Sequence, residues 1–378
     1  MVRRWIAGVA LTALCVAYGA EAQQSALDTP EAHYRQGLRE LEKGDTAGAS
    51  EAFGRAQKLN PGYAGAYVGL ALVALEQRKA AQAEEYLKAA RKKDKKFVDI
   101  YIVEGRLLSR LRPGDDWLKK AMEQFEKAAK LDPGNDKIFY YQGETYKDAL
   151  MLQEAETAYG KAVGLKGDLQ DAASARLSLV QDIRRAVPGT NAGVRIGLVP
   201  ALHRGELAAL LADELKLKAL IARRRPKAPD TSFQGYGATG ATSPPASKPA
   251  PPPDIAGHWA KGWIEDVLSL EVAGLGIYPD GRFGPDDPVT RATFAQVVQG
   301  ILLLVTGDQG LATKYVGETS RFTDVRPDAY YYNAAALCVD RGFLRSDKIS
   351  GQFKPEAVVS GAEALLAIKD LKEGLAPR

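Results

Sequence analysis

The chain has 378 residues, which corresponds to two or three domains at about 150 residues per domain. Its 51 lysines and arginines stand against 47 aspartates and glutamates, so the net charge is only +4. This small excess argues against nucleic acid as a partner, because nucleic-acid-binding proteins concentrate basic charge on one face. Two cysteines and three histidines are too few for a zinc module or a disulfide scaffold. The composition predicts several domains that act through their surfaces.

Residues 1–22 have the pattern of a secretory signal peptide. Two arginines precede a mostly apolar run over residues 5–17, which is shorter than the roughly 20 residues of a membrane-spanning helix. Ala20-Glu21-Ala22 then supplies the small-x-small pattern that a signal peptidase reads. We expect a mature start at Gln23, no transmembrane span after cleavage, and export to the periplasm, cell envelope or cell surface. A signal that stays uncleaved as a membrane anchor is the alternative.

Residues 30–166 contain an internal repeat with a period of about 34 residues. A small residue recurs once per unit, at Gly37, Ala71, Gly105 and Gly143. Such residues allow two antiparallel helices to approach closely, and an aromatic residue at positions 53, 125 and 159 fills the gap between hairpins. Prolines 61 and 133 end the second helix of a unit, because proline lacks the backbone N–H. The third unit carries extra residues around 112–115.

This pattern resembles the tetratricopeptide repeat, and the resemblance implies four helical hairpins stacked into an α-solenoid. The first helix of each hairpin should line a concave groove that suits a protein or peptide partner, whose identity the sequence does not specify. For the apolar members of the groove, packing of hairpin against hairpin is the alternative. The register places ten side chains on this face: Tyr34, Leu38, Val68, Leu72, Ile102, Arg106, Arg110, Tyr140, Glu144 and Lys147.

Two further segments follow the repeats. Residues 167–221 retain helical patterns, and the amphipathic run over 171–187 suits a cap on the last hairpin. Residues 222–253 are rich in proline, alanine and serine. Because this composition cannot bury a core, we expect a disordered linker. The sequence therefore predicts an all-α protein with a solenoid and a small helical unit joined by this linker.

The region after the linker contains a motif of a helix, a Pro-Asp-Gly turn and a second helix. Within residues 254–305 it reads Asp254-Ile-Ala-Gly-His-Trp259, Tyr278-Pro-Asp-Gly-Arg-Phe283 and Thr290-Arg-Ala292. A degenerate copy over residues 320–372 opens with Phe322-Thr-Asp-Val325. Both resemble the S-layer homology motif.

A partial copy precedes the linker. Leu202-His-Arg-Gly-Glu-Leu207 resembles the end of another S-layer homology motif. Because such motifs usually come in threes, the resemblance implies a pseudo-threefold unit whose first copy is separated from the second by the linker.

The same resemblance implies a binding role. In this family the motifs hold proteins on the cell wall by gripping an acidic, often pyruvylated, glycan in grooves between copies. The motif arginine would pair with a carboxylate through two parallel hydrogen bonds. Thr293 replaces the usual glutamate in the second copy, and Gly361 replaces the arginine in the last. The residues implied in glycan binding are Arg204, Glu206, Asp254, Trp259, Arg291, Asp324 and Glu363.

Structural roles are the alternative for several of these residues. Trp259 would then belong to the core, and Asp254 and Asp324 would cap helices. Cys338 lies in an apolar helical run, which favours a buried small hydrophobe over a nucleophile.

The chain contains no Gly-rich phosphate loop, paired catalytic carboxylates or serine nucleophile elbow. We therefore expect no enzyme, metal or cofactor. The sequence favours a non-enzymatic envelope scaffold that binds a protein and a peptidoglycan-associated glycan. The alternative is a periplasmic protein–protein adaptor of an outer-membrane or secretion assembly, with no glycan binding.

Overall fold

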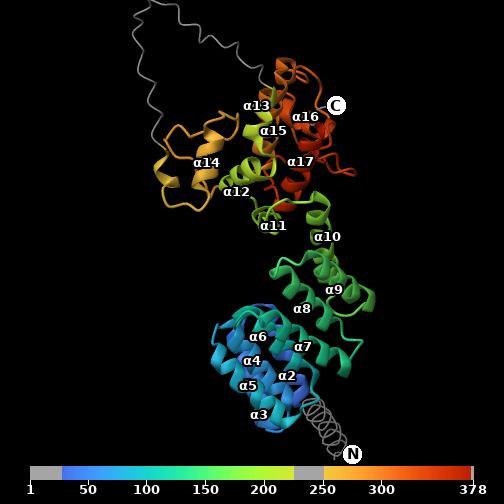
Figure 1. Cartoon of the computed structure of the whole chain (residues 1–378). Helices are drawn as coiled ribbons and strands as arrows, with labels where there is room; N and C mark the ends of the chain where they lie inside the picture. Colours follow the sequence, from blue (N-terminus) through green and yellow to red (C-terminus); the bar gives the residue numbers. More distant parts are fainter. Residues whose placement is uncertain (1–27, 225–250, 376–378) are drawn as a thin grey trace, which may run out of the picture. The chain divides into compact units, whose positions relative to one another are not determined.

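The computed structural model describes residues 28–224 and 251–375, and these residues form helices and two isolated β-bridges but no β-strand. The expected all-α fold is therefore confirmed for this part of the chain (Figure 1). Contacts divide the chain into two compact units, one ending at Leu177 and the other beginning at Ser178. The expected signal peptide and most of the expected linker lie outside the described residues.

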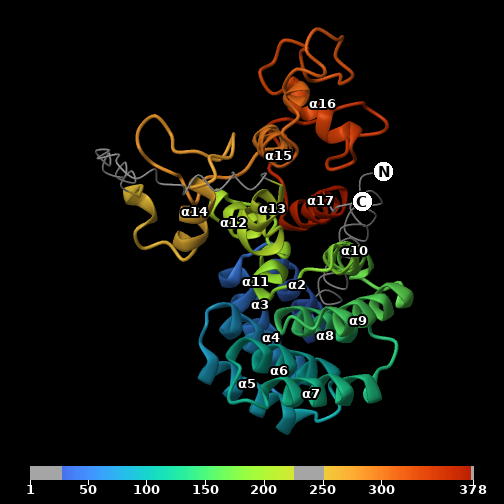
Figure 2. The same cartoon turned by 45° about the horizontal axis from the view of Figure 1, so that its top comes forward.

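From residue 28 onwards the first unit contains four helix pairs in chain order, and the two helices of each pair pack closely (Figures 1 and 2). Helix α10 (Gln170–Ala186) follows them and contains the division between the two units. The pairs are α2 (Pro30–Glu42) with α3 (Thr46–Leu59), α4 (Ala64–Glu76) with α5 (Ala80–Lys93), α6 (Val98–Leu111) with α7 (Trp117–Leu131), and α8 (Asp136–Asp148) with α9 (Leu152–Leu165).

In the first, third and fourth pairs a glycine of the first helix faces an aromatic ring of the second. A Cβ atom added to Gly105 would lie 2.7 Å from Cζ of Phe125, and one added to Gly143 would lie 2.6 Å from Cδ1 of Tyr159. Both rings are buried. Because real Cβ atoms do not approach other atoms so closely, these positions hold the helices at a separation that only glycine permits.

The extra residues of the third repeat form an ordered connection between α6 and α7. Arg112 ends α6 in the left-handed region, with φ of +49°. Its guanidinium lies 4.9 Å from the ring centroid of Trp117 and donates to the carbonyl of Asp148 at 2.9 Å. The insertion is thus held against both the helix that follows it and the next repeat.

The second unit is built from short helices around a small core. Among the described residues, no helix is long and apolar enough to span a membrane. The elements are α11 (Asn191–Gly197), α12 (Arg204–Ala209), the π-helical turn η1 (Leu210–Glu214), α13 (Leu217–Arg224), the 3-10 turn η2 (Pro253–Ile255), α14 (Lys261–Leu268), α15 (Arg291–Thr306), the 3-10 turn η3 (Gln309–Ala312), α16 (Tyr332–Asp340) and α17 (Gly361–Gly374).

The expected linker over residues 222–253 is too wide at both ends. Its first three residues complete α13, and Pro253 begins η2. Ile221 near one end and Ile255 near the other are buried, so apolar contacts extend the folded unit into both margins of the proline-rich segment.

A cyclic set of backbone hydrogen bonds joins three parts of this unit. Leu202 N donates to Val359 O at 2.8 Å, Val359 N donates to Val289 O at 3.0 Å, and Val289 N donates to Leu202 O at 2.8 Å. All three side chains are fully buried. The residue after each one, His203, Thr290 or Ser360, is the N-cap of α12, α15 or α17. This arrangement puts residues 202–209 together with the two later copies around one pseudo-threefold centre.

Candidate binding sites

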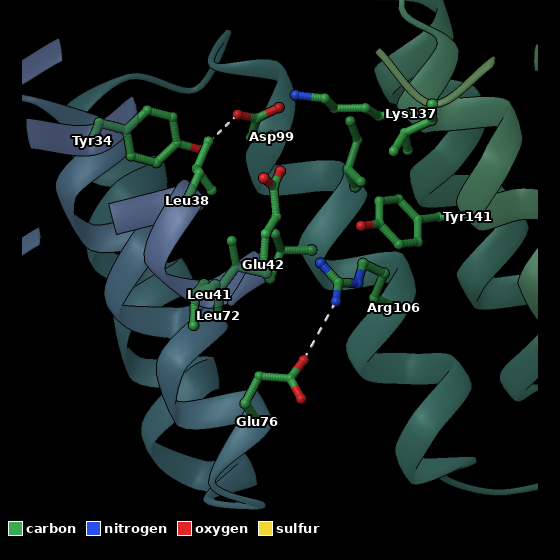
Figure 3. A pocket seen from close by; sticks show the side chains of 13 residues that line it. Tyr34, Leu38, Leu41, Glu42, Leu72, Glu76, Asp99, Arg106, Lys137 and Tyr141 are labelled. Carbon is green, nitrogen blue, oxygen red and sulfur yellow. Dashed lines mark hydrogen bonds and ion pairs between the residues drawn. The ribbon is translucent and has the colours of Figure 1, made fainter. Parts of the chain in front are cut away.

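A cavity of about 240 Å³ opens among the first helices of all four repeats (Figure 3). Residues of α2, α4, α6 and α8 contribute to it, together with the segment that leads into α10. Apolar side chains form much of its wall, and five charged groups reach it. The lining residues are Tyr34, Leu38, Leu41, Glu42, Leu72, Glu76, Asp99, Ile102, Val103, Arg106, Lys137, Tyr141 and Leu169.

Several polar groups of the cavity are already paired. The hydroxyl of Tyr34 donates to Oδ2 of Asp99 at 2.6 Å. Burial and the charge of Asp99 hold the pKa of Tyr34 well above its usual value, so the tyrosine stays protonated as the donor. The guanidinium of Arg106 lies 4.3 Å from the ring centroid of Tyr141 and 3.6 Å from Oε1 of Glu76. These contacts fix the polar side of the cavity before any ligand binds.

Half of the expected groove residues line this cavity: Tyr34, Leu38, Leu72, Ile102 and Arg106. Arg110 lies outside the cavity, donates to the carbonyl of Leu75 at 3.3 Å and approaches Glu76 at 3.5 Å. Val68 is 0% exposed and packs in the apolar core, so its expected role in the groove is wrong. The reason is that α4 is buried on almost every side, as expected for a helix whose residues are apolar or small on all faces before Glu76.

The expected groove residues of the last repeat do not line the cavity either. Glu144 accepts hydrogen bonds from the hydroxyl of Tyr159 and from Nζ of Lys147, both at 2.6 Å, and its other close partner is Nε of Arg176 at 3.2 Å. The ring of Tyr140 packs against that of Tyr159 with 6.0 Å between centroids. Arg176 comes from helix α10, which follows the repeats, so Tyr140, Glu144 and Lys147 serve an internal network instead.

Sequence reasoning missed several charged and aromatic residues of the cavity. Glu42 and Glu76 each follow an expected leucine, Leu38 and Leu72, by four residues. Residues four apart share one helix face, so this spacing was the available signal. Lys137 and Tyr141 are another pair at this spacing on α8.

In the second unit, Arg204 is buried and turned inward. Its side chain is 3% exposed and donates to the carbonyls of Phe283 at 2.8 Å, Gly274 at 3.3 Å and Gly276 at 2.6 Å. The guanidinium also lies 4.7 Å from the ring centroid of Phe283 and 4.5 Å from that of Tyr278. Burial lowers the pKa of Arg204. The expectation that this arginine grips a glycan carboxylate is wrong, because internal carbonyls occupy its donors.

Arg291 makes the matching contacts one copy further along. Its Nε donates to the carbonyl of Phe353 at 2.7 Å, and Nη2 donates to that of Arg345 at 2.5 Å. Nη1 pairs with Glu363, which therefore serves inside the unit. Only 9% of Arg291 is exposed, so its expected glycan contact is also wrong.

The third contact between copies explains why the last copy has a glycine where the first two have an arginine. Phe283 and Phe353 lie seven residues before the N-caps of their copies, and Ile196 lies seven residues before His203. A Cβ atom added to Gly361 would overlap the carbonyl oxygen of Ile196. Two contacts between copies are thus made by an arginine, and the third is a direct backbone approach that requires glycine.

The two expected glycan-binding aspartates hold backbone turns. Asp254 accepts from the N–H groups of Phe283 at 3.1 Å and Gly284 at 2.7 Å. Asp324 accepts from those of Phe353 at 2.8 Å and Lys354 at 2.7 Å. Burial opposes ionisation of Asp254, but its backbone hydrogen bonds outweigh this effect and lower its pKa. Both carboxylates therefore bind turns 29 residues downstream, and neither caps a helix as the alternative proposed.

Glu206 also has an internal partner. Its Oε2 accepts from the backbone N–H of His203 at 2.8 Å, which completes a capping box at the start of α12. Of the expected glycan-binding residues, Trp259 and Asp324 are exposed, and 57% of Trp259 is accessible.

Two aromatic pairs extend from the surface of this unit. The ring of Trp259 lies 5.7 Å from that of Trp263 and 5.5 Å from that of His258. Tyr330 is 82% exposed, and its ring lies 5.0 Å from that of Tyr331. In residues 28–224 and 251–375 no cluster of histidine, cysteine, aspartate and glutamate side chains is arranged to hold a metal ion.

Comparison with known families agrees with the two folded regions. A sequence model of the tetratricopeptide repeat matches residues 40–106, and one of the S-layer homology domain matches residues 253–295 and 321–365. The chain therefore carries tetratricopeptide repeats on its N-terminal side and two S-layer homology domains on its C-terminal side. These matches indicate protein–protein interaction for the repeats and cell-wall or envelope association for the C-terminal domains, and both families are typically non-catalytic.

Several solved structures resemble part of the chain. A thermophilic tetratricopeptide repeat protein of Thermus thermophilus is 19% identical, with a TM-score of 0.36 over 51% of this chain and 96% of that protein. PilF of Pseudomonas aeruginosa is 20% identical, with a TM-score of 0.34 over 50% of this chain and 91% of PilF. Yeast Tom70 is 15% identical, with a TM-score of 0.32 over 45% of this chain and 43% of Tom70. No curated protein matches the chain.

Proposed function

We propose that the protein is an exported, non-enzymatic scaffold of the cell envelope. The repeats bind a segment of a partner protein, and the C-terminal unit attaches to an acidic glycan of the cell wall. The proposal that the repeats bind a partner protein rests on the cavity to which all four repeats contribute. This cavity offers apolar and charged side chains to one ligand. A concave surface with an apolar wall and a few directed polar groups suits an extended peptide.

The glycan half rests on the S-layer homology matches and on the exposed aromatic pairs. Because Arg204 and Arg291 donate to internal groups, we assign the glycan contact to the aromatic surface. Trp259 and Tyr330 present large exposed rings, which combine apolar area with a polar handle. Such rings can cover the apolar face of a sugar.

Co-sedimentation of the full-length mature protein with purified cell-wall material tests this assignment. Trp259→Ala should lower the bound fraction severalfold, because the exposed indole is removed without disturbing the buried core. Ile349→Ala is the control, since it removes a fully exposed apolar side chain from the second unit. Circular dichroism should be unchanged in both variants. Equal sedimentation of wild type and Trp259→Ala would refute the aromatic contact.

A second candidate function is a periplasmic protein–protein adaptor without glycan binding. One observation favours it: the arginine of the first copy and that of the second are buried by internal contacts, and the third copy has Gly361. If wild-type protein does not sediment with wall material under any ionic strength, the adaptor function replaces the glycan-binding one.

A further inference from the structure

We infer that the cavity of the repeats selects its partner through a cationic side chain, lysine or arginine, bound between Glu42 and Asp99. This inference rests on the proposed function, because it assumes that the cavity receives a segment of a protein. It adds the chemical class of the residue that the cavity recognises.

The charges of the cavity are not balanced internally. Glu76 lies 3.6 Å from Arg106 and 3.5 Å from Arg110, so this carboxylate has cationic partners. Lys137 lies 3.7 Å from Oδ2 of Asp168, which is itself largely exposed. These contacts compensate Glu76 and assign both lining cations to acidic partners.

Two carboxylates keep their charge. Asp99 accepts from the neutral hydroxyl of Tyr34, which orients the carboxylate but does not cancel its charge. Glu42 is exposed and makes no hydrogen bond or ion pair with the residues that the structure describes. Figure 3 shows the carboxylate of Glu42 extending towards Asp99, whose own carboxylate faces the hydroxyl of Tyr34 and the end of Lys137. Like charges in one pocket repel, so a ligand cation placed between them is favoured.

The walls of the cavity fit the stem of such a residue. Leu38, Leu41 and Leu72 line it beside the two carboxylates. Lysine and arginine bury their methylene groups along apolar surface while the charged end meets polar groups. An acidic ligand residue would meet two uncompensated carboxylates, and this disfavours it. A partner's C-terminal carboxylate is disfavoured for the same reason.

A displayed library of random dodecapeptides, selected on the full-length mature protein, tests the inference. Lysine and arginine should be enriched at one position of the selected peptides. In fluorescence polarisation, replacing that residue by glutamine should weaken binding about three- to tenfold, in the range of a partly exposed charge-assisted contact. The effect should shrink as ionic strength rises.

Variants of the protein localise the contact. Glu42→Gln should weaken binding of the selected peptide and should remove most of its preference for lysine over glutamine. Glu42→Lys should bind better to a peptide in which the selected cation is replaced by glutamate. Glu51→Gln is the control, because Glu51 is exposed on α3 and does not line the cavity.

The outcomes separate the inference from the proposed function. Selected peptides that bind without cation preference, or whose preference survives in Glu42→Gln, overturn the inference and leave peptide binding by the repeats intact. A selection that enriches no peptide on the folded protein overturns both.

Discussion

Replacing Arg204 by alanine should destabilise the second unit strongly, and the structure sets the size of the effect. The guanidinium makes three hydrogen bonds to carbonyls of the second copy and is 3% exposed. A hydrogen bond to a charged group contributes about 1.5–3 kcal/mol, so three of them set a ceiling of about 5–9 kcal/mol. Water that enters the vacated space will satisfy part of the carbonyl groups. We therefore expect a loss of about 3–5 kcal/mol, the range found when one partner of a buried charged contact is removed.

Urea unfolding followed by hydrogen exchange on the full-length protein measures this loss, because exchange reports the two units separately. Protection should fall in α12, α14 and α15, while α2–α9 keep wild-type protection. Arg326→Ala is the control: its side chain is 83% exposed, so it should change stability by about 0–1 kcal/mol. If Arg204→Ala costs no more than Arg326→Ala, the arginine is not a structural clamp. Loss of wall binding in Arg204→Ala, taken alone, would reflect unfolding and not a glycan contact.

Four further predictions rest on the same contacts and on the first residues. Gly105→Leu should destabilise the solenoid by about 1–3 kcal/mol because it overpacks against Phe125; limited proteolysis should then show new cuts between residues 64 and 164, and unchanged protection would contradict the helix register. A protease site introduced between residues 225 and 250 should, once cut, leave two fragments that co-elute in gel filtration. The reason is that Leu202 forms the cyclic set of backbone hydrogen bonds with Val289 and Val359. Separation of the fragments in native buffer would show that these bonds do not hold the copies together. The pKa of Asp254 is lowered in the folded state. Its contribution to stability is therefore present above its pKa in the unfolded chain, about 3.9, and is lost as pH falls through its pKa in the folded protein. Acid unfolding of Asp254→Asn should thus depend less on pH below about 4 than that of wild type. N-terminal sequencing of protein from the envelope fraction should find Gln23, and an intact Met1 there would refute cleavage.

Contacts within one repeat or one motif were predictable from the residues alone. Gly105 and Phe125 lie 20 residues apart, and Gly143 and Tyr159 lie 16 apart, so each pair reports a contact inside a single repeat. Thr290 and Ser360 cap helices through hydrogen bonds to residues three positions ahead. Such contacts repeat with the chain's own period, and for this reason the hairpins and the positions of the motif copies were readable from the residues alone.

Which side chains remain available to a ligand depends on contacts between segments that are far apart in the chain. The carbonyl partners of Arg204 lie 70 to 79 residues downstream, on the other side of the proline-rich segment. An arginine fork suits a ligand carboxylate or a cluster of backbone carbonyls equally well, so its sequence motif could not distinguish them. In the same way, Glu144 is paired by Arg176 from the helix that follows the repeats. Residue type determines which interactions a side chain can make. Packing between distant segments determines whether it makes them with other residues of the protein or with a partner.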